Sequence, residues 1–371
     1  MSVVTAGQPT RDRLDAARDR ERQIRRKMVA LQEELDWHCY QAYGLMNESI
    51  ESPDPPEIER GERAFELLLA RRLADGEVRT TWFEWLGIAP RKDLPDGWSL
   101  EYRRAVERRI ELIRSDRRIG LIENVNCKRR WEWESWEVRE QHALREWLLD
   151  RLETEIYWPR DGDVPLRSTS RLADLARTDS DFMRVAVLYA GDDTFDVGQV
   201  VAELVGPESV PCLPALRYTD DGLRKRASWE HAWDLQRQQD VTGACLDVPV
   251  PPKYKSSDFS SGTYWRLRGP LDVPEERFVS YPGATLDADG TRVITWAGYN
   301  HLQQAKALAG YYLDLKDNHG WGPERLIPLL AGLAELLPWL KQWHNEPDPA
   351  LGERMGIILR ASSKTRPGRW V

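Results

Sequence analysis

The chain has 371 residues, of which 41% are hydrophobic and 31% are charged, a composition typical of a soluble globular protein with two or three domains. Its formal net charge of −8 at pH 7 argues against indiscriminate binding to nucleic acid, although a local basic patch is compatible with an acidic whole. Four widely spaced cysteines favour free thiols in a reducing cytoplasm, and the longest apolar run, 326–340, is too short to span a membrane. We therefore expect a cytoplasmic protein without a membrane segment.

A disordered lead over residues 1–10 and a helical bundle over 11–158 are predicted first. Within 11–43, mostly apolar residues recur at alternating spacings of three and four, which predicts a long amphipathic helix packed against another helix. The residues of this stripe are Leu14, Ala17, Ile24, Met28, Leu31, Leu35, His38 and Ala42. After a proline-rich break at 52–56, the capping and periodicity signals predict further helices. Their ranges are 60–73, 100–119 and 135–156.

Residues 159–168 predict a linker, followed by an α+β domain over 169–360 and a basic tail over 361–371. The helices expected in this domain cover 169–177, 181–190, 197–205, 223–239, 299–316 and 323–343. Two strands, 277–281 and 292–296, are separated by an Asp289-Gly290 turn signal and predict a small antiparallel sheet. The fold class expected for the whole chain is mainly α, or α+β, with an α-rich C-terminal domain.

Four stretches combine basic and aromatic residues and supply the candidate nucleic-acid contacts. The candidates are Lys128, Arg129, Arg130, Arg224, Lys225, Arg226, Lys253, Lys255, Tyr264, Trp265, Arg266 and Arg268. Arginine and lysine contact phosphates, while aromatic rings stack on bases. The alternative is ordinary loop anchoring, in which the rings are buried and the cations pair with the surplus carboxylates. The residues alone leave both interpretations open.

Catalytic motifs are absent from the sequence. An adenine-N6 methyltransferase needs an acidic or amide residue followed by two prolines and an aromatic that stacks on the extruded base. The nearest match, Asp54-Pro55-Pro56, is followed by Glu57, which cannot stack. No glycine-rich loop follows a strand to hold a methyl donor, and the six histidines have no metal-ligand spacing. We therefore expect no catalytic residue, no metal site and no cofactor in this chain.

Four long segments nevertheless resemble one known family. The segments LRKRASWEHAWDLQR, VPPKYKSSDFSSGTYWRLRGPLDVPEERFVSYPGA and LPWLKQWHNEPD resemble the C-terminal region of the PglX family. These are adenine-specific DNA methyltransferases of phage-growth-limitation, or BREX-type (type 2), defence systems. MVALQEELDWHCYQAYGL resembles the segment after the methyltransferase core in that family, where an acidic residue precedes two tyrosines and a Gly-Leu pair. The matching residues here are Asp36, Tyr40, Tyr43, Gly44 and Leu45.

The resemblance implies a non-catalytic module of such a methyltransferase, acting in anti-phage defence. S-adenosylmethionine is then expected only in the catalytic domain, whose motifs are missing here. In such enzymes, the parts outside the catalytic core recognise the target or bind partner proteins. The implied partners are double-stranded DNA, the methyltransferase domain or other BREX proteins, and phage inhibitors that mimic DNA. The alternative is a purely structural scaffold of the defence complex that makes no DNA contact.

Overall fold

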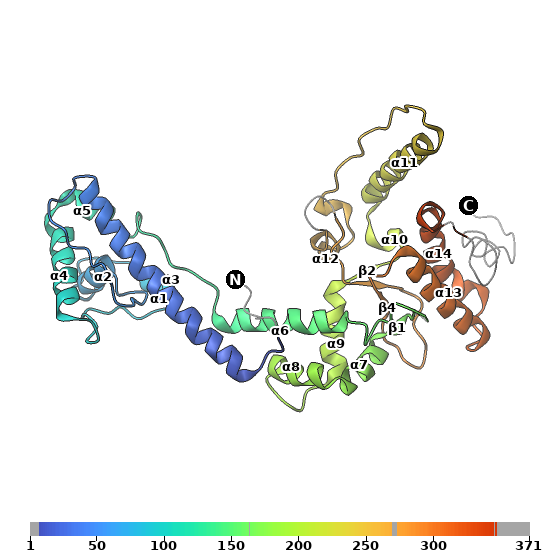
Figure 1. Cartoon of the computed structure of the whole chain (residues 1–371), viewed down its shortest axis with the longest axis horizontal. Helices are drawn as coiled ribbons and strands as arrows, with labels where there is room; N and C mark the ends of the chain where they lie inside the picture. Colours follow the sequence, from blue (N-terminus) through green and yellow to red (C-terminus); the bar gives the residue numbers. More distant parts are fainter. Residues whose placement is uncertain (1–6, 163, 269–272, 345, 347–371) are drawn as a thin grey trace. The chain divides into compact units, whose positions relative to one another are not determined.

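The computed structural model describes residues 7–162, 164–268, 273–344 and 346, and it confirms a mainly α fold with a small sheet. The chain forms two compact units, residues 1–142 and residues 143–371. Within the described residues there are fourteen α-helices and four short strands (Figure 1). Most of the predicted lead and the whole predicted basic tail lie outside the described residues. None of the described helices has both the length and the apolar character needed to cross a membrane.

The first unit is helical. Its elements are α1 (Arg11–Ala42), α2 (Ala64–Ala74), α3 (Trp82–Leu86), α4 (Leu100–Ser115), α5 (Arg117–Ile122) and the start of α6 (Trp136–Leu152). Thr10 caps α1 and Ser99 caps α4, each by accepting a hydrogen bond from a backbone N–H of the first turn. One predicted helix, 100–119, is two helices, because Asp116 adopts an extended backbone and its carboxylate caps α5.

The face of α1 that packs into the core differs from the predicted one. Ile24, Met28, Leu31 and Leu35 of the predicted stripe are 41–53% exposed, so this part of the prediction is wrong. Leu14 of the predicted stripe is buried, and the other residues that α1 buries are Val29, Ala30, Glu33, Glu34, Trp37 and Tyr40. The pattern of apolar residues does not predict burial of this face, because two of its residues are glutamates, which are rarely buried without a partner.

Buried ion pairs compensate the acidic residues of this core. The Arg109 side chain is fully buried and donates to both carboxylate oxygens of Glu34, at 2.9 and 2.6 Å. The Tyr102 hydroxyl donates to the same carboxylate at 3.0 Å. A second buried pair joins Arg63 and Glu66 at 2.8 Å. Because buried charges are tolerated only when paired and hydrogen-bonded, the contacts of Glu34 with Arg109 and Tyr102 allow this face of α1 to turn inward.

The second unit combines helices with a small sheet. Its elements are the rest of α6, β1 (Arg167–Ser168), α7 (Thr169–Thr178), α8 (Ser180–Ala190), α9 (Val197–Val205), η1 (Gly206–Glu208), β2 (Ser209–Pro211), α10 (Pro214–Arg217), α11 (Asp220–Thr242), η2 (Ser256–Asp258), α12 (Gly262–Arg266), β3 (Phe278–Ser280), β4 (Val293–Trp296), α13 (His301–Asp317) and α14 (Pro323–Trp343). The two compact units divide within α6, and the domain boundaries predicted at 158 and 169 stay predictions.

The sheet has the strand order β1-β4-β3-β2. β3 and β4 form the expected antiparallel pair, with Val279 opposite Thr295. β1 adds an antiparallel partner to β4, and β2 pairs parallel to β3 with Val210 opposite Val279. The sheet is therefore mixed and not purely antiparallel. β1 and β2 were not predicted from the sequence, because strands of two and three residues are too short to show alternation.

Replacing Arg109 with methionine should destabilise the first unit by about 3–5 kcal/mol, because Glu34 would remain as a buried charge without its cation. Urea unfolding followed by tryptophan fluorescence measures this loss. Arg108→Met is the matched control, since the neighbouring Arg108 is exposed and pairs with Glu48 at the surface. Equal stability of the two variants would contradict the assigned role of the buried pair.

Candidate functional site

Lys128, the first of the candidate DNA contacts, is buried in the first unit. Its ammonium lies 2.6 Å from Asp36 Oδ2, 2.6 Å from Glu123 Oε1 and 3.9 Å from Glu33 Oε2. Burial disfavours its charge, but the surrounding carboxylates outweigh burial and raise the pKa of Lys128. A lysine enclosed in this way neutralises the acids of the core and is not accessible to a phosphate.

Arg129 and Arg130, which follow Lys128, are exposed and lie on tryptophan rings. The Arg129 guanidinium is 4.4 Å from the centre of the Trp131 ring, and that of Arg130 is 5.1 Å from the Trp85 ring. Trp85 itself is 64% exposed. Stacking holds these two cations at the surface, where they stay candidates for anion contact.

The three cations of α11 all have carboxylate partners. Lys225 Nζ lies 2.6 Å from Asp258 Oδ2, and that same oxygen accepts the Lys255 backbone N–H at 2.6 Å. Arg224 pairs with Asp221 on its own helix. Arg226 pairs with Glu230 at 2.8 Å and with Glu335 at 2.6 Å. These contacts tie α11 to the following loop and to α14, as the anchoring interpretation expects.

Gly222 explains how α11 approaches this loop so closely. A Cβ atom at residue 222 would lie 2.0 Å from the carbonyl oxygen of Asp258. Thr219 caps the helix and its backbone N–H donates to the same carbonyl at 2.9 Å. Glycine is therefore required here by a close approach of two backbone segments and not by a ligand.

An aromatic cluster holds the segment that contains Tyr264, Trp265 and Arg268. Its buried members are Tyr218, Tyr254 and Phe259. The Trp265 ring lies 5.6 Å from Phe259, and the Arg268 guanidinium lies 4.9 Å from the Tyr254 ring. Trp265 and Arg268 thus have packing partners within the protein. Lys253 and Lys255, at the start of the segment, are exposed.

Two candidates, Tyr264 and Arg266, line an open groove of about 610 Å³ in the second unit. Arg292 also lines the groove, and none of its lining residues within the described part of the chain is a carboxylate. Both arginines are exposed, and each donates one hydrogen bond that orients it, Arg266 to Thr263 Oγ1 at 3.3 Å and Arg292 to the Gly206 carbonyl at 3.2 Å. The remaining polar side chains are hydroxyls, of Ser209, Ser261, Thr263, Ser280, Tyr281 and Thr285.

We call this cavity the arginine groove. Guanidinium forks and hydroxyl donors are the groups that proteins use to hold phosphate oxygens. Arg292 was not among the sequence candidates, because a single arginine before a short strand carries no pattern. The fold brings it to the same cavity as Arg266, twenty-six positions away in the sequence.

The Glu123 carboxylate beside Lys128 should give the stability of the protein a measurable pH dependence. Burial raises its pKa to about 7. The folded state then holds a proton that the unfolded state releases near pH 4.5, so stability should fall as pH rises from about 4.5 to 7, by about 2–3 kcal/mol. Burial alone would raise the pKa of the neighbouring Glu33, but nearby cations, chiefly Lys128, lower it. Glu33 therefore stays ionised above pH 4.5, and its contribution to stability changes only below that pH.

Glu123→Gln should flatten this fall, and urea midpoints at pH 5 and 7.5 would measure it. Glu101→Gln, an exposed residue of α4, is the matched control and should leave the pH profile of the parent protein unchanged. If stability falls with pH as steeply in Glu123→Gln as in the parent protein, Glu123 is not the source of the pH dependence.

Comparison with known proteins places these features in a family. The family model described as "Domain of unknown function (DUF7008)" matches residues 28–369. The chain is 44% identical over 361 residues to the adenine-specific methyltransferase PglX of Streptomyces coelicolor, covering 94% of this chain and 29% of that relative. It thus spans less than a third of the length of this curated relative, and no solved structure matches it. The chain belongs to the DUF7008 family and is similar to one region of a PglX adenine-specific methyltransferase.

Proposed function

We propose that this chain is a DNA-engaging, non-catalytic region of a PglX-type adenine-specific methyltransferase that acts in phage defence. The observation that carries the proposal is the arginine groove, where two exposed arginines line a cavity that has no carboxylate among its described lining residues. The similarity to PglX supplies the enzyme class, and the groove supplies a surface on which a phosphate backbone fits. Methyl transfer and S-adenosylmethionine belong, in this proposal, to the catalytic part of such an enzyme.

The charge distribution supports binding of phosphates at this groove in particular. The chain as a whole is acidic, with a net charge of −8, so it repels DNA except where cations lie apart from acids. Lys225 and Arg226 pair with carboxylates, whereas Arg266 and Arg292 donate to a neutral hydroxyl and a carbonyl. We expect weak-to-moderate binding that depends strongly on salt.

Protein partners are a second candidate, favoured by a different observation. Ile24, Met28, Leu31 and Leu35 form an exposed apolar stripe on α1 at spacings of four, three and four. Such a stripe is typical of a helix face that another helix covers. The proposed partners are the methyltransferase domain or other BREX proteins. Phage inhibitors that mimic DNA would instead compete for the arginine groove.

The double variant Arg266→Ala, Arg292→Ala tests the DNA proposal. Removing one phosphate-binding cation should flatten the slope of log affinity against log salt by about one unit, so the slope of the double variant should be shallower by about two units. Affinity should fall alike for all duplex sequences, because cations that bind phosphates provide no direct base readout. Fluorescence anisotropy with labelled duplexes at several salt concentrations measures both quantities.

Arg171→Ala, Arg184→Ala is the matched control, because these arginines of α7 and α8 are similarly exposed and lie outside the groove. It should bind as the parent does, and thermal unfolding of all three proteins checks that the groove is intact. If the parent protein does not bind duplex at low salt, or if the groove variant binds as tightly as the control, the scaffold interpretation replaces this one.

A further inference from the structure

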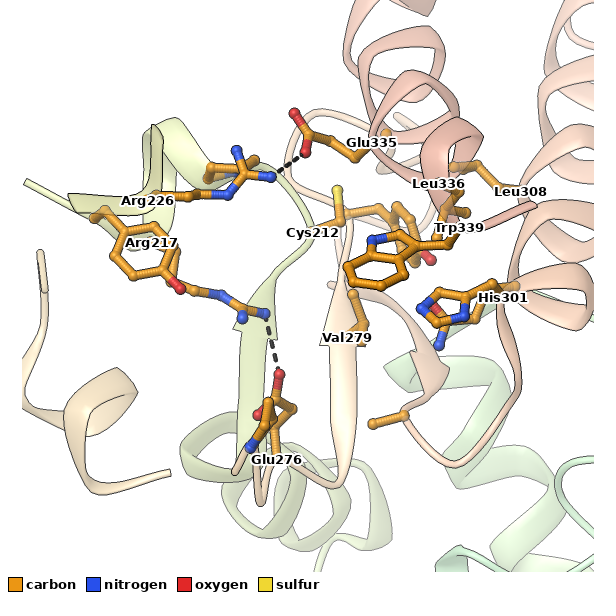
Figure 2. A pocket seen from close by; sticks show the side chains of 17 residues that line it. Cys212, Arg217, Arg226, Glu276, Val279, His301, Leu308, Glu335, Leu336 and Trp339 are labelled. Carbon is orange, nitrogen blue, oxygen red and sulfur yellow. Dashed lines mark hydrogen bonds and ion pairs between the residues drawn. The ribbon is translucent and has the colours of Figure 1, made fainter. Parts of the chain in front are cut away.

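A second cavity, which we call the aromatic pocket, lies on the opposite face of the small sheet from the arginine groove. It has a volume of about 350 Å³ and is lined from α10, α11, the end of β2, β3, α13 and α14 (Figure 2). Consecutive residues of a strand point to opposite faces of a sheet. Accordingly, Val279 of β3 lines the aromatic pocket and Ser280 lines the groove. Among the described residues, the two linings have Tyr281 alone in common, so a ligand in one cavity does not occupy the other.

Two ion pairs form the polar walls of the pocket. Arg217 Nη2 lies 3.2 Å from Glu276 Oε1, and Arg226 Nη2 lies 2.6 Å from Glu335 Oε2 (Figure 2). Burial, with the nearby His344, lowers the pKa of His301, so that its ring is neutral at pH 7. The charges of the lining therefore cancel. Neither a phosphate nor a cation gains from entering, whereas a neutral ligand finds both donors and acceptors.

Flat aromatic rings form another wall. The Trp339 indole stands in the centre of the view in Figure 2, and His301 stacks on it with ring centres 5.2 Å apart and planes 10° from parallel. Tyr218 also lines the cavity. Burial raises the pKa of the Cys212 thiol to about 12, so the sulfur facing this space is a neutral thiol and not a nucleophile.

We infer that the aromatic pocket binds an uncharged planar heteroaromatic compound of the size and polarity of a purine nucleoside. The ring stacks on aromatic side chains, its N–H groups donate to Glu276 or Glu335, and its ring nitrogens or carbonyl accept from Arg217 or Arg226. A volume of about 350 Å³ lies at the small end of ligand cavities, which suits a nucleoside better than a larger cofactor. This site is separate from the proposed DNA groove and does not depend on it.

Calorimetric titration with adenosine, guanosine, cytidine, thymidine and the matching 5′-monophosphates tests the inference on the full chain. Purine nucleosides should bind saturably, pyrimidine nucleosides more weakly because they stack less, and each monophosphate more weakly than its nucleoside. Absence of saturable binding by any nucleoside at millimolar concentration would overturn the inference. So would a preference for the monophosphates.

Glu335→Gln gives a signature that a purely structural role does not produce. Arg226 keeps its pairing with Glu230, so the fold should be retained, but the lining gains one net positive charge. Purine nucleoside affinity should fall by about tenfold, and the preference for nucleoside over monophosphate should narrow or reverse. Glu324→Gln, the same change at an exposed position of α14 outside the pocket, should alter neither quantity. If Glu335→Gln keeps the parent's preference for nucleoside over monophosphate, nucleosides do not bind in the aromatic pocket.

Trp339→Leu removes the stacking surface. The affinity for every nucleoside should fall by about tenfold, and the ranking of the nucleosides by affinity should stay the same. The groove variant Arg266→Ala, Arg292→Ala should bind purine nucleosides as the parent does, and Glu335→Gln should bind duplex as the parent does. Failure of duplex binding alone would therefore refute the DNA proposal and leave the pocket standing. Failure of nucleoside binding alone would refute the nucleoside site and leave the DNA proposal standing.

Discussion

Arg109 and Lys128 neutralise the carboxylates that α1 turns into the core, and the fold of residues 1–142 depends on this neutralisation. Glu34 receives two hydrogen bonds from Arg109, while Asp36 and Glu33 of the same helix lie 2.6 and 3.9 Å from the Lys128 ammonium. Without these cations, the buried face of α1 would carry uncompensated charge, and the exposed stripe of Ile24, Met28, Leu31 and Leu35 would be the more favourable face to bury. The ion pairs thus select the orientation of α1 and leave an apolar stripe at the surface.

The same demand for neutralisation shapes the second unit. Lys225 pairs with Asp258, Arg226 pairs with Glu335, and Arg277 contacts three acids of α6, namely Glu146, Asp150 and Glu153. The chain has a net charge of −8, and within its described part many basic residues have such a partner, so a basic sequence motif is a poor guide to a basic surface. What distinguishes Arg266 and Arg292 is the neutral character of their neighbours, which leaves their charge available to a ligand.

The small sheet separates two environments of different polarity. On one side, the described lining of the arginine groove has cations and hydroxyls and no carboxylate. On the other side, the aromatic pocket pairs each of its arginines with a glutamate. Alternation along β3 assigns adjacent residues to these two faces, so a strand of three residues helps to build both sites. The proposed phosphate binding and the proposed nucleoside binding follow from this difference in charge balance.

The sequence by itself determined the helices with strong caps and periodicity, the antiparallel pair of β3 and β4, the absence of catalytic motifs and the resemblance to PglX. These features are local or rest on continuous segments, so neighbouring residues suffice to reveal them. Only the tertiary structure decided which face of α1 is buried, that Lys128 is enclosed while Arg266 is exposed, and that Arg292 lines the same groove as Arg266. The same holds for β1 and β2, for the pairing of Arg226 with Glu335, and for the stack of His301 on Trp339. The physical reason is that burial and charge pairing depend on which distant carboxylate or ring lies within a few ångströms, and spacing along the chain does not record that distance.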